Sequence, residues 1–174
     1  MGRFEICKTA KPAIDNINII MSAVFEYPTE EYRLMTQDDL DAIMRIEEDA
    51  YQFPWSLTIF SDCIKAGYNC WVSELDNEII GYAVFINAVQ ECHLLNLCID
   101  PDLQRKGYGR RLLAKVLDDA KEHDASCVFL EVRPSNQQAI QLYESEGFNE
   151  VGMRKKYYPT KSGREDAVIF AKEL

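Results

Sequence analysis

One stretch near the middle of the chain couples a strand, a turn with two glycines and a helix. The apolar run 94–99 is typical of a buried strand, and Asp100-Pro101-Asp102 ends it. Beyond the turn 104–109, apolar residues recur at helical spacing: Leu112, Leu113, Val116, Leu117 and Ala120. This order directs free backbone N–H groups and the positive end of a helix dipole at one point. It predicts a site for an anion such as phosphate.

The residues of the turn fit an anion without being specific for one. Gly107 and Gly109 have no Cβ, so a ligand can approach the backbone closely. The dinucleotide fingerprint fails because Leu112 stands where its third glycine belongs, and the Walker sequence is missing too. From these residues alone, an ordinary tight turn before a solvated basic helix stays open. Four cations accompany the turn: Arg105, Lys106, Arg110 and Arg111.

Composition limits the class of protein. With 174 residues, 47% of them hydrophobic, the chain predicts one folded domain with a substantial core. A net charge of −10 disfavours direct nucleic-acid binding and favours a basic protein or peptide partner. No apolar run reaches the roughly 18 residues of a membrane helix. The six cysteines form no C-x-x-C pair and only two histidines are present, which predicts reduced thiols, a cytoplasmic protein and no metal site.

Residues 1–29 are predicted to be an N-terminal extension of unknown role. Asp15 and Asn16 interrupt its apolar stretch, so it makes a poor signal peptide. Met21 is a candidate natural start, and a packed additional helix is the alternative. The remaining residues, 30–174, are predicted to form a single mixed α/β domain, because strand and helix patterns alternate along them.

Turn and capping signals give the predicted elements of this domain. Helices are expected after a capping box at 36–39, after Ser56, and after a capping box at 135–138 that leads to a stop at Gly147. Asp76-Asn77 predicts a hairpin between two strands. The predicted strands are 70–75, 79–86, 92–99 and 127–132, followed by 148–157 and 167–172 joined by a loop.

Several side chains are candidates for chemistry. Glu131 is a lone carboxylate in an apolar strand, which requires either an ion pair, with Arg133 or Arg154, or a functional role. Tyr143 lies in the middle of a helix, where core packing is the alternative to catalysis. Cys98 as an acyl-accepting nucleophile is disfavoured, because only His93 is near it in sequence as a base.

Five separated motifs resemble those of the GNAT acyltransferases, and among them the bacterial ribosomal-protein-alanine N-acetyltransferases. They lie at 53–56, 104–109, 130–136, 142–148 and 157–167, so the resemblance extends over about residues 32–170. The turn resembles the family's Q/R-x-x-G-x-G/A signature, which holds the pyrophosphate of acetyl-coenzyme A. The resemblance implies a mixed sheet of about seven strands with about four helices, splayed where coenzyme A enters.

The resemblance also implies roles for individual residues. Glu131 would be the general base and Tyr143 the general acid, with no metal involved. The expected contacts to acetyl-coenzyme A are Leu97, Cys98, Ile99, Arg105, Lys106, Gly107, Tyr108, Gly109, Arg110 and Asn136. The expected contacts to the acceptor are Phe53, Trp55, Tyr157 and Tyr158.

The implied reaction is direct acetyl transfer to the N-terminal alanine α-amine of small-subunit ribosomal protein S-eighteen. Two alternatives stay open: acetylation of lysine or a small amine on the same fold, and a coenzyme A-binding module without activity. Release of free thiol in the presence of an amine distinguishes an enzyme from a binding module. The motif Gly163-Arg164-Glu165-Asp166 belongs to the resemblance without an evident mechanism.

Overall fold

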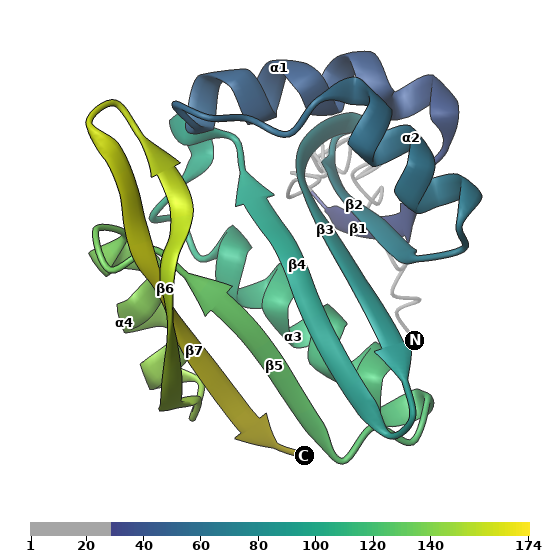
Figure 1. Ribbon diagram of the computed structural model, residues 1–174. Helices are drawn as coiled ribbons and strands as arrows, with labels where there is room; N and C mark the ends of the chain where they lie inside the picture. Colours follow the sequence, from purple (N-terminus) through teal and green to yellow (C-terminus); the bar gives the residue numbers. More distant parts are fainter. Residues whose placement is uncertain (1–28) are drawn as a thin grey trace, which may run out of the picture.

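The structure is a computed structural model that describes residues 29–174; the expectations for the extension, including Met21, concern residues outside this range. Seven strands form one sheet in the order β1-β2-β3-β4-β5-β7-β6 (Figure 1). The strands are β1 Glu30–Leu34, β2 Asn69–Leu75, β3 Glu78–Ala88, β4 Glu91–Ile99, β5 Cys127–Val132, β6 Asn149–Thr160 and β7 Gly163–Glu173. Only β4 and β5 pair in parallel among these strands. The predicted mixed fold with seven strands is confirmed.

Four α-helices cover the two faces of the sheet. They are α1 Leu40–Ala50, α2 Leu57–Lys65, α3 Tyr108–Glu122 and α4 Gln137–Ser145, with short 3₁₀ turns at Gln37–Asp39 and Pro101–Leu103. A hydrophobic core lies on each face of the sheet, and alternate residues of β3 pack into one or the other. Tyr82 packs with the side chains of α1 and α2, and Phe85 packs with those of α3. This is the period of two expected of a strand buried on both faces. No helix in the described range is long and apolar enough to cross a membrane.

The sheet opens between its two parallel strands. Pairing of β4 with β5 extends only from Glu91 to Leu94 on β4, opposite Cys127–Leu130 on β5. The rest of β4 continues to pair with β3 as far as Ile99. The second halves of β4 and β5 therefore diverge and are not hydrogen-bonded to each other (Figure 1).

Most of the turns and helix caps predicted from local sequence signals are present in the structure. Asp76 and Asn77 both have positive φ, 53° and 67°, in the tight turn between β2 and β3. The Ser56 side chain accepts a hydrogen bond from the Ile59 N–H at the start of α2. The capping box at 36–39 is present, with the Thr36 N–H donating to the Asp39 carboxylate at 2.7 Å.

Two predictions for the second half of the chain were wrong in detail. Asn136, and not Ser135, caps α4, because its side chain accepts from the Ala139 N–H at 3.1 Å. The Ser135 hydroxyl instead donates to Glu165, a contact that the local sequence does not indicate. The last two strands are also longer than expected: β6 and β7 pair as far as Thr160 and Gly163, so a short turn replaces the predicted loop.

Candidate active site

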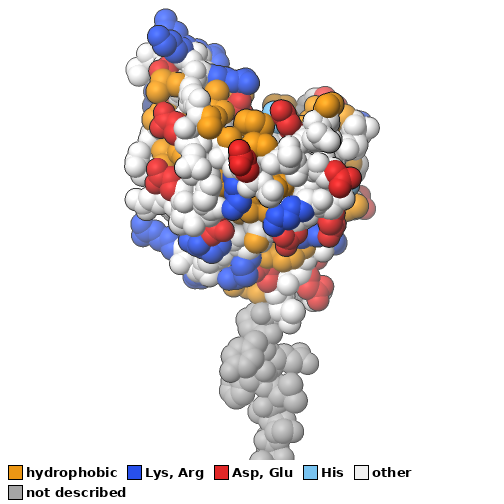
Figure 2. Space-filling model, turned by 90° about the horizontal axis from the view of Figure 1, so that it is seen from below, with side chains coloured by type: hydrophobic (Ala, Val, Ile, Leu, Met, Phe, Trp, Pro, Cys, Tyr) orange, Lys and Arg blue, Asp and Glu red, His pale blue; other side chains and the backbone are white. Residues whose placement is uncertain are grey.

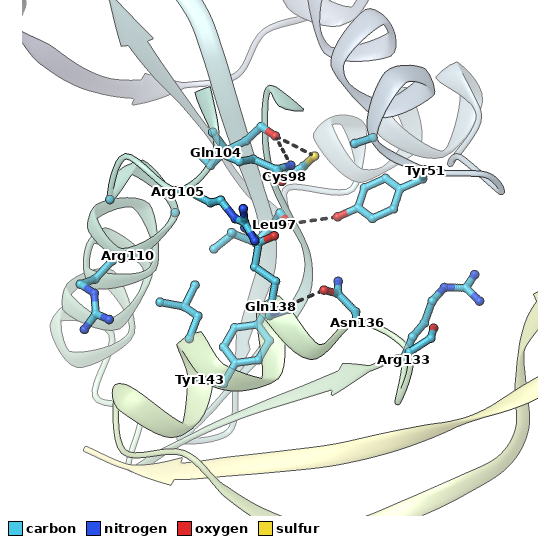
Figure 3. Close-up of a pocket in the computed structure, with 17 residues that line it drawn as sticks. Tyr51, Leu97, Cys98, Gln104, Arg105, Arg110, Arg133, Asn136, Gln138 and Tyr143 are labelled. Carbon is cyan, nitrogen blue, oxygen red and sulfur yellow. Dashed lines mark hydrogen bonds between the residues drawn. The ribbon is translucent and has the colours of Figure 1, made fainter. Parts of the chain in front are cut away.

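The diverging strands open into a cavity of about 610 Å³ between β4, the glycine turn and α4 (Figure 3). Leu97, Cys98 and Ile99 of β4 form one wall. Leu142 and Tyr143 of α4 form the other. Most of the residues expected to contact acetyl-coenzyme A line this cavity: Leu97, Cys98, Ile99, Arg105, Gly107, Gly109, Arg110 and Asn136.

The glycine turn leaves the start of α3 open to a ligand. Gly107 precedes the helix with φ of 88°, a conformation that favours glycine, and it offers no side chain as a cap. The first N–H groups of α3 therefore have no side-chain acceptor. Gln104 fixes the turn to the end of β4, because its side-chain amide donates to the Ile99 carbonyl at 3.0 Å. The turn thus has the geometry of an anion site.

The cations of the turn differ in their surroundings. Arg105 lines the cavity, whereas the Lys106 ammonium donates to the Asp102 carbonyl at 3.1 Å and lies outside the lining. Arg110 lines the cavity while pairing with Glu146, the residue that follows α4.

The fourth cation of the turn points away from the cavity. Arg111 pairs with Glu30 of β1, and its guanidinium lies 4.5 Å from the centre of the Tyr108 ring. Tyr108 also lies outside the cavity lining. Among the turn's cations, Arg105 and Arg110 are therefore the ones that can reach a ligand in the cavity.

A second cavity, of about 360 Å³, meets the first at the diverging strands. Leu97 and Tyr143 line both cavities, together with Tyr51, Arg133, Asn136 and Ala139. Phe53, Trp55 and Tyr158 line the second cavity, as expected for an acceptor site. Tyr157 does not line it; its ring packs edge-on against Tyr158 at 4.8 Å. A thioester in the first cavity and an amine in the second would meet beside Tyr143.

Glu131 lies on the wall of the second cavity. Its side chain is 21% exposed, and its carboxylate is 3.2 Å from the Arg154 guanidinium on β6. The ion pair with Arg154 that the sequence offered as an alternative to a catalytic role is therefore present. The Tyr158 hydroxyl donates to the Glu131 backbone carbonyl at 3.0 Å, which joins β5 to the acceptor wall, the part of the second cavity lined by Phe53, Trp55 and Tyr158.

Tyr143, at the junction of the two cavities, and Cys98, in the larger cavity, are both neutral groups. Burial raises the pKa of the Tyr143 phenol to about 12, so it stays protonated at neutral pH. Burial also raises the pKa of the Cys98 thiol to about 12, which disfavours a thiolate nucleophile there. His93 is bonded to Glu91 at 3.0 Å and stacked on Phe129, so it does not serve Cys98 as a base.

Sequence reasoning missed Tyr51, which follows α1 and lines both cavities. Its hydroxyl donates to the Leu97 carbonyl at 3.2 Å, the backbone group that β5 would bond if the strands had not diverged (Figure 3). Burial raises the pKa of this phenol, which keeps it a donor. Its position after a helix gave no periodic signal.

The motif Gly163-Arg164-Glu165-Asp166 shapes a bulge in β6. Arg154 pairs with Ala167 and Tyr158 with Glu165, so three residues of β6 lie opposite one residue of β7. Lys156 in the bulge has φ of 54°, and its N–H donates to the Asp166 carboxylate at 2.8 Å. The Arg164 guanidinium donates to the Lys156 carbonyl at 2.6 Å. These bonds satisfy the backbone groups that the bulge removes from the ladder.

Glu165 of the same motif holds Arg133 in place. The Arg133 guanidinium donates to the Glu165 carboxylate at 2.7 Å and to the Pro159 carbonyl at 3.0 Å. It also lies over the Tyr158 ring, 4.3 Å from its centre. The motif therefore builds the acceptor wall through Arg133 and Tyr158. No group of residues suited to a metal ion occurs within 29–174.

Comparison with known proteins agrees with this geometry. The acetyltransferase (GNAT) family matches residues 26–148, which is more than half of the chain. The chain belongs to the acetyltransferase (GNAT) family. It is 41% identical to the ribosomal protein bS18-alanine N-acetyltransferase of Escherichia coli K12 over 133 residues, covering 76% of this chain and 90% of that protein. The Salmonella typhimurium protein of the same name is 40% identical over 138 residues, covering 79% and 93%.

Two solved structures have the same fold as this chain. The crystal structure of the Escherichia coli ribosomal-protein-alanine N-acetyltransferase matches with a TM-score of 0.78 and 38% identity, covering 84% of this chain and 94% of that one. The Ard1 protein of Thermoplasma volcanium matches with a TM-score of 0.75 at 22% identity, covering 83% and 97%, which shows the fold alone.

Proposed function

We propose that this GNAT acetyltransferase transfers the acetyl group of acetyl-coenzyme A to the α-amine of the N-terminal alanine of ribosomal protein bS18. The observation that carries the proposal is the pair of joined cavities, with an anion turn at the far end of one and Glu131 in the other. The names of the relatives that match at about 40% identity over most of their length support the choice of acceptor.

In this proposal, acetyl-coenzyme A occupies the larger cavity. The first-turn N–H groups of α3 and the Arg105 guanidinium hold its pyrophosphate, because both present positive charge to an anion. The thioester lies beside Leu97, Cys98 and Ile99, whose backbone groups are free of β5. The acceptor N-terminus enters the second cavity between Trp55 and Tyr158.

Glu131 acts as the general base in the proposed reaction. It takes a proton from the acceptor ammonium, directly or through a water, and the amine then attacks the thioester carbonyl. The new C–N bond forms as the C–S bond breaks, and the surplus proton on the nitrogen is then lost to solvent, from which Tyr143 regains the proton that it gives to the thiolate. The Arg154 guanidinium, 3.2 Å from the Glu131 carboxylate, holds this base on the wall of the second cavity.

Tyr143 acts as the general acid, giving its proton to the departing thiolate. Its pKa of about 12 lies above the value near 8.5 of a free thiol, so this transfer would be uphill in water. Burial also raises the pKa of the Cys98 thiol in the larger cavity, so we expect the pKa of a coenzyme A thiol buried beside it to be raised as well. The burial of the site thus brings the two pKa values closer together.

The reaction itself favours an α-amine over lysine. An α-ammonium with a pKa of about 7.7–8.0 costs roughly 1 to 1.4 kcal/mol to deprotonate at pH 7. A lysine near 10.4 would cost roughly 4.6 kcal/mol, more than one carboxylate base readily supplies.

We infer that the acceptor is the free ribosomal protein in the cytoplasm. The chain carries a net charge of −10, which favours a basic protein and disfavours the phosphates of assembled ribosomal RNA. Acidic and basic side chains are interspersed over the face shown in Figure 2, unlike the continuous basic track of an RNA-binding surface.

Mass spectrometry of acetylated peptides tests the proposal. The protein is incubated with acetyl-coenzyme A and three acceptors: the N-terminal peptide of bS18, the same peptide blocked at its α-amine with a lysine added, and spermidine. Acetylation of the free α-amine alone is expected. Preferred acetylation of lysine or spermidine would refute the acceptor, and binding of acetyl-coenzyme A without release of thiol would refute catalysis.

A further inference from the structure

A second carboxylate, Glu47 of α1, lies at the acceptor cavity. It is 1% exposed and yet belongs to the lining of the second cavity. Helical spacing places it on the same face as Leu40 and Ile43, so the sequence puts a charged residue on the apolar side of an amphipathic helix. A buried acid at such a position requires a physical explanation.

Neutral donors hold the Glu47 carboxylate. The backbone N–H of Trp55 donates to one carboxylate oxygen at 2.7 Å, and the Tyr82 hydroxyl donates to the other. The Asn96 side chain supplies a further hydrogen bond. A carboxylate has about four acceptor positions, so three bonds leave one available.

The charge of Glu47 has no cationic partner within the described range, and in this it differs from the other charged residues at the cavity. Glu131 is paired with Arg154, and Arg133 with Glu165. Desolvation raises the pKa of the Glu47 carboxyl, as expected for an uncompensated buried charge. The acceptor cavity therefore contains two ion pairs and one unbalanced carboxylate.

We propose that Glu47 recognises the acceptor's α-ammonium, supplying the negative charge that favours a cationic N-terminus in the second cavity. This inference rests on the proposed function and adds a binding residue to it. The ammonium supplies the missing counter-charge, and Glu131 remains the group that removes the proton. Trp55 links Glu47 to the acceptor wall, because its backbone N–H donates to the Glu47 carboxylate and the residue itself lines the second cavity.

Measuring the binding of two peptides in the presence of coenzyme A distinguishes recognition of the ammonium by Glu47 from a purely structural role of Glu47 in the acceptor wall. One peptide begins with alanine; in the other a propionyl group replaces the alanine, which removes only the ammonium. Calorimetry on the wild-type protein is expected to show a preference for the first peptide. In Glu47→Gln this preference should fall about tenfold, equivalent to about 1.4 kcal/mol. Glu48→Gln is the control, because Glu48 neighbours Glu47 on α1 but is exposed.

The outcomes distinguish the two proposals. If Glu47→Gln weakens the binding of both peptides equally, Glu47 only positions the acceptor wall. If the preference for the first peptide is unchanged, Glu47 does not recognise the ammonium. Either result overturns the inference. A wild-type protein that acetylates the first peptide while giving these results leaves the proposed function intact. A wild-type protein that neither binds nor acetylates it refutes both.

A pH titration decides the matter if Glu47→Gln does not fold. It uses the Glu131→Gln background, so that Glu47 is the remaining carboxylate of the cavity lining. The groups that face Glu47 from the neighbouring elements, Tyr51, Tyr82 and Cys98, have pKa values raised by burial and stay neutral. The preference for the first peptide should fall as lower pH protonates Glu47. A preference independent of pH between 4 and 7 would overturn the inference.

Discussion

Replacing Gly81 by alanine tests how tightly the diverging strands are fixed. Gly81 of β3 lies opposite Ile99 of β4, and a Cβ added there would be 2.7 Å from the Cys98 carbonyl oxygen. It would also meet the end of the Ile99 side chain, which can rotate away. The Cys98 carbonyl cannot, because the backbone on either side of it is held in the β3–β4 pairing. The substitution must therefore push the two strands apart at the end of β4.

The expected cost of Gly81→Ala is about 1–3 kcal/mol in the free energy of unfolding, the usual range for overpacking. For a domain of this size, each kcal/mol lowers the melting temperature by about 2–4 °C. Because Cys98 and Ile99 line the larger cavity, the KM for acetyl-coenzyme A should rise as well. Urea denaturation and steady-state kinetics at fixed peptide measure the two effects.

Gly152→Ala provides the matched control. Gly152 lies in β6, where a Cβ would be 3.7 Å from the end of the Ile169 side chain, an ordinary contact. We expect a change within about 0.5 kcal/mol and no effect on KM. If Gly81→Ala matches the wild type in both stability and KM, the close approach at Cys98 is not rigid and the argument fails.

Four further predictions concern the site and the ion pair between Arg33 and Asp39 outside it. Glu131→Gln should lower kcat by roughly 10²–10⁴, with a smaller loss at high pH where the amine is already free. Tyr143→Phe should lower kcat while keeping affinity for acetyl-coenzyme A. A wild-type kcat at neutral pH in either variant would contradict the role of that residue. Arg164→Ala removes the donor that stabilises the bulge of β6, so the KM for the peptide should rise and that for acetyl-coenzyme A should not; equal changes in both would argue against a local effect. Hydrogen bonds from Arg33 hold the pKa of Asp39 at about 2, so this pair stabilises the fold above the unfolded pKa of about 3.9 and is lost as pH falls towards about 2. Arg33→Gln should therefore flatten the fall in unfolding free energy between about pH 4 and 2, and an unchanged slope would show that the pair contributes little.

Most elements of this fold could be predicted from the sequence because their signals are local, whereas strand β1 (Glu30–Leu34) was missed. Asp76-Asn77 is compatible with positive φ, and Ser56 caps a helix with its own side chain. Gly107 allows the left-handed turn from which α3 starts. Each of these signals acts within a few residues, so no knowledge of the neighbouring strands was needed.

The candidate site was only partly predictable, because its residues meet across long distances in the sequence. The sequence allowed Glu131 two cationic partners, Arg133 and Arg154, and only the position of β6 selects Arg154. Ser135 was predicted to cap a helix, but in the folded protein β7 places Glu165 beside it, and the Ser135 hydroxyl donates to that carboxylate instead. In both cases the decisive contact depends on strand order, which no local pattern specifies.

Two features were decided by tertiary structure alone. The divergence of β4 and β5 depends on where their pairing stops, after Leu94, although both strands were correctly predicted. The unbalanced charge of Glu47 depends on which groups surround it. Helical periodicity places Glu47 on the buried face of α1, but only the packed sheet supplies Tyr82 as a neutral donor and no cation. The sequence by itself thus determined six of the seven strands, the turn at Asp76-Asn77 and the starts of α1, α2 and α3, because these follow from short-range geometry. The open cleft and its charge balance were decided by the tertiary structure, because they depend on contacts between residues that are distant in the sequence.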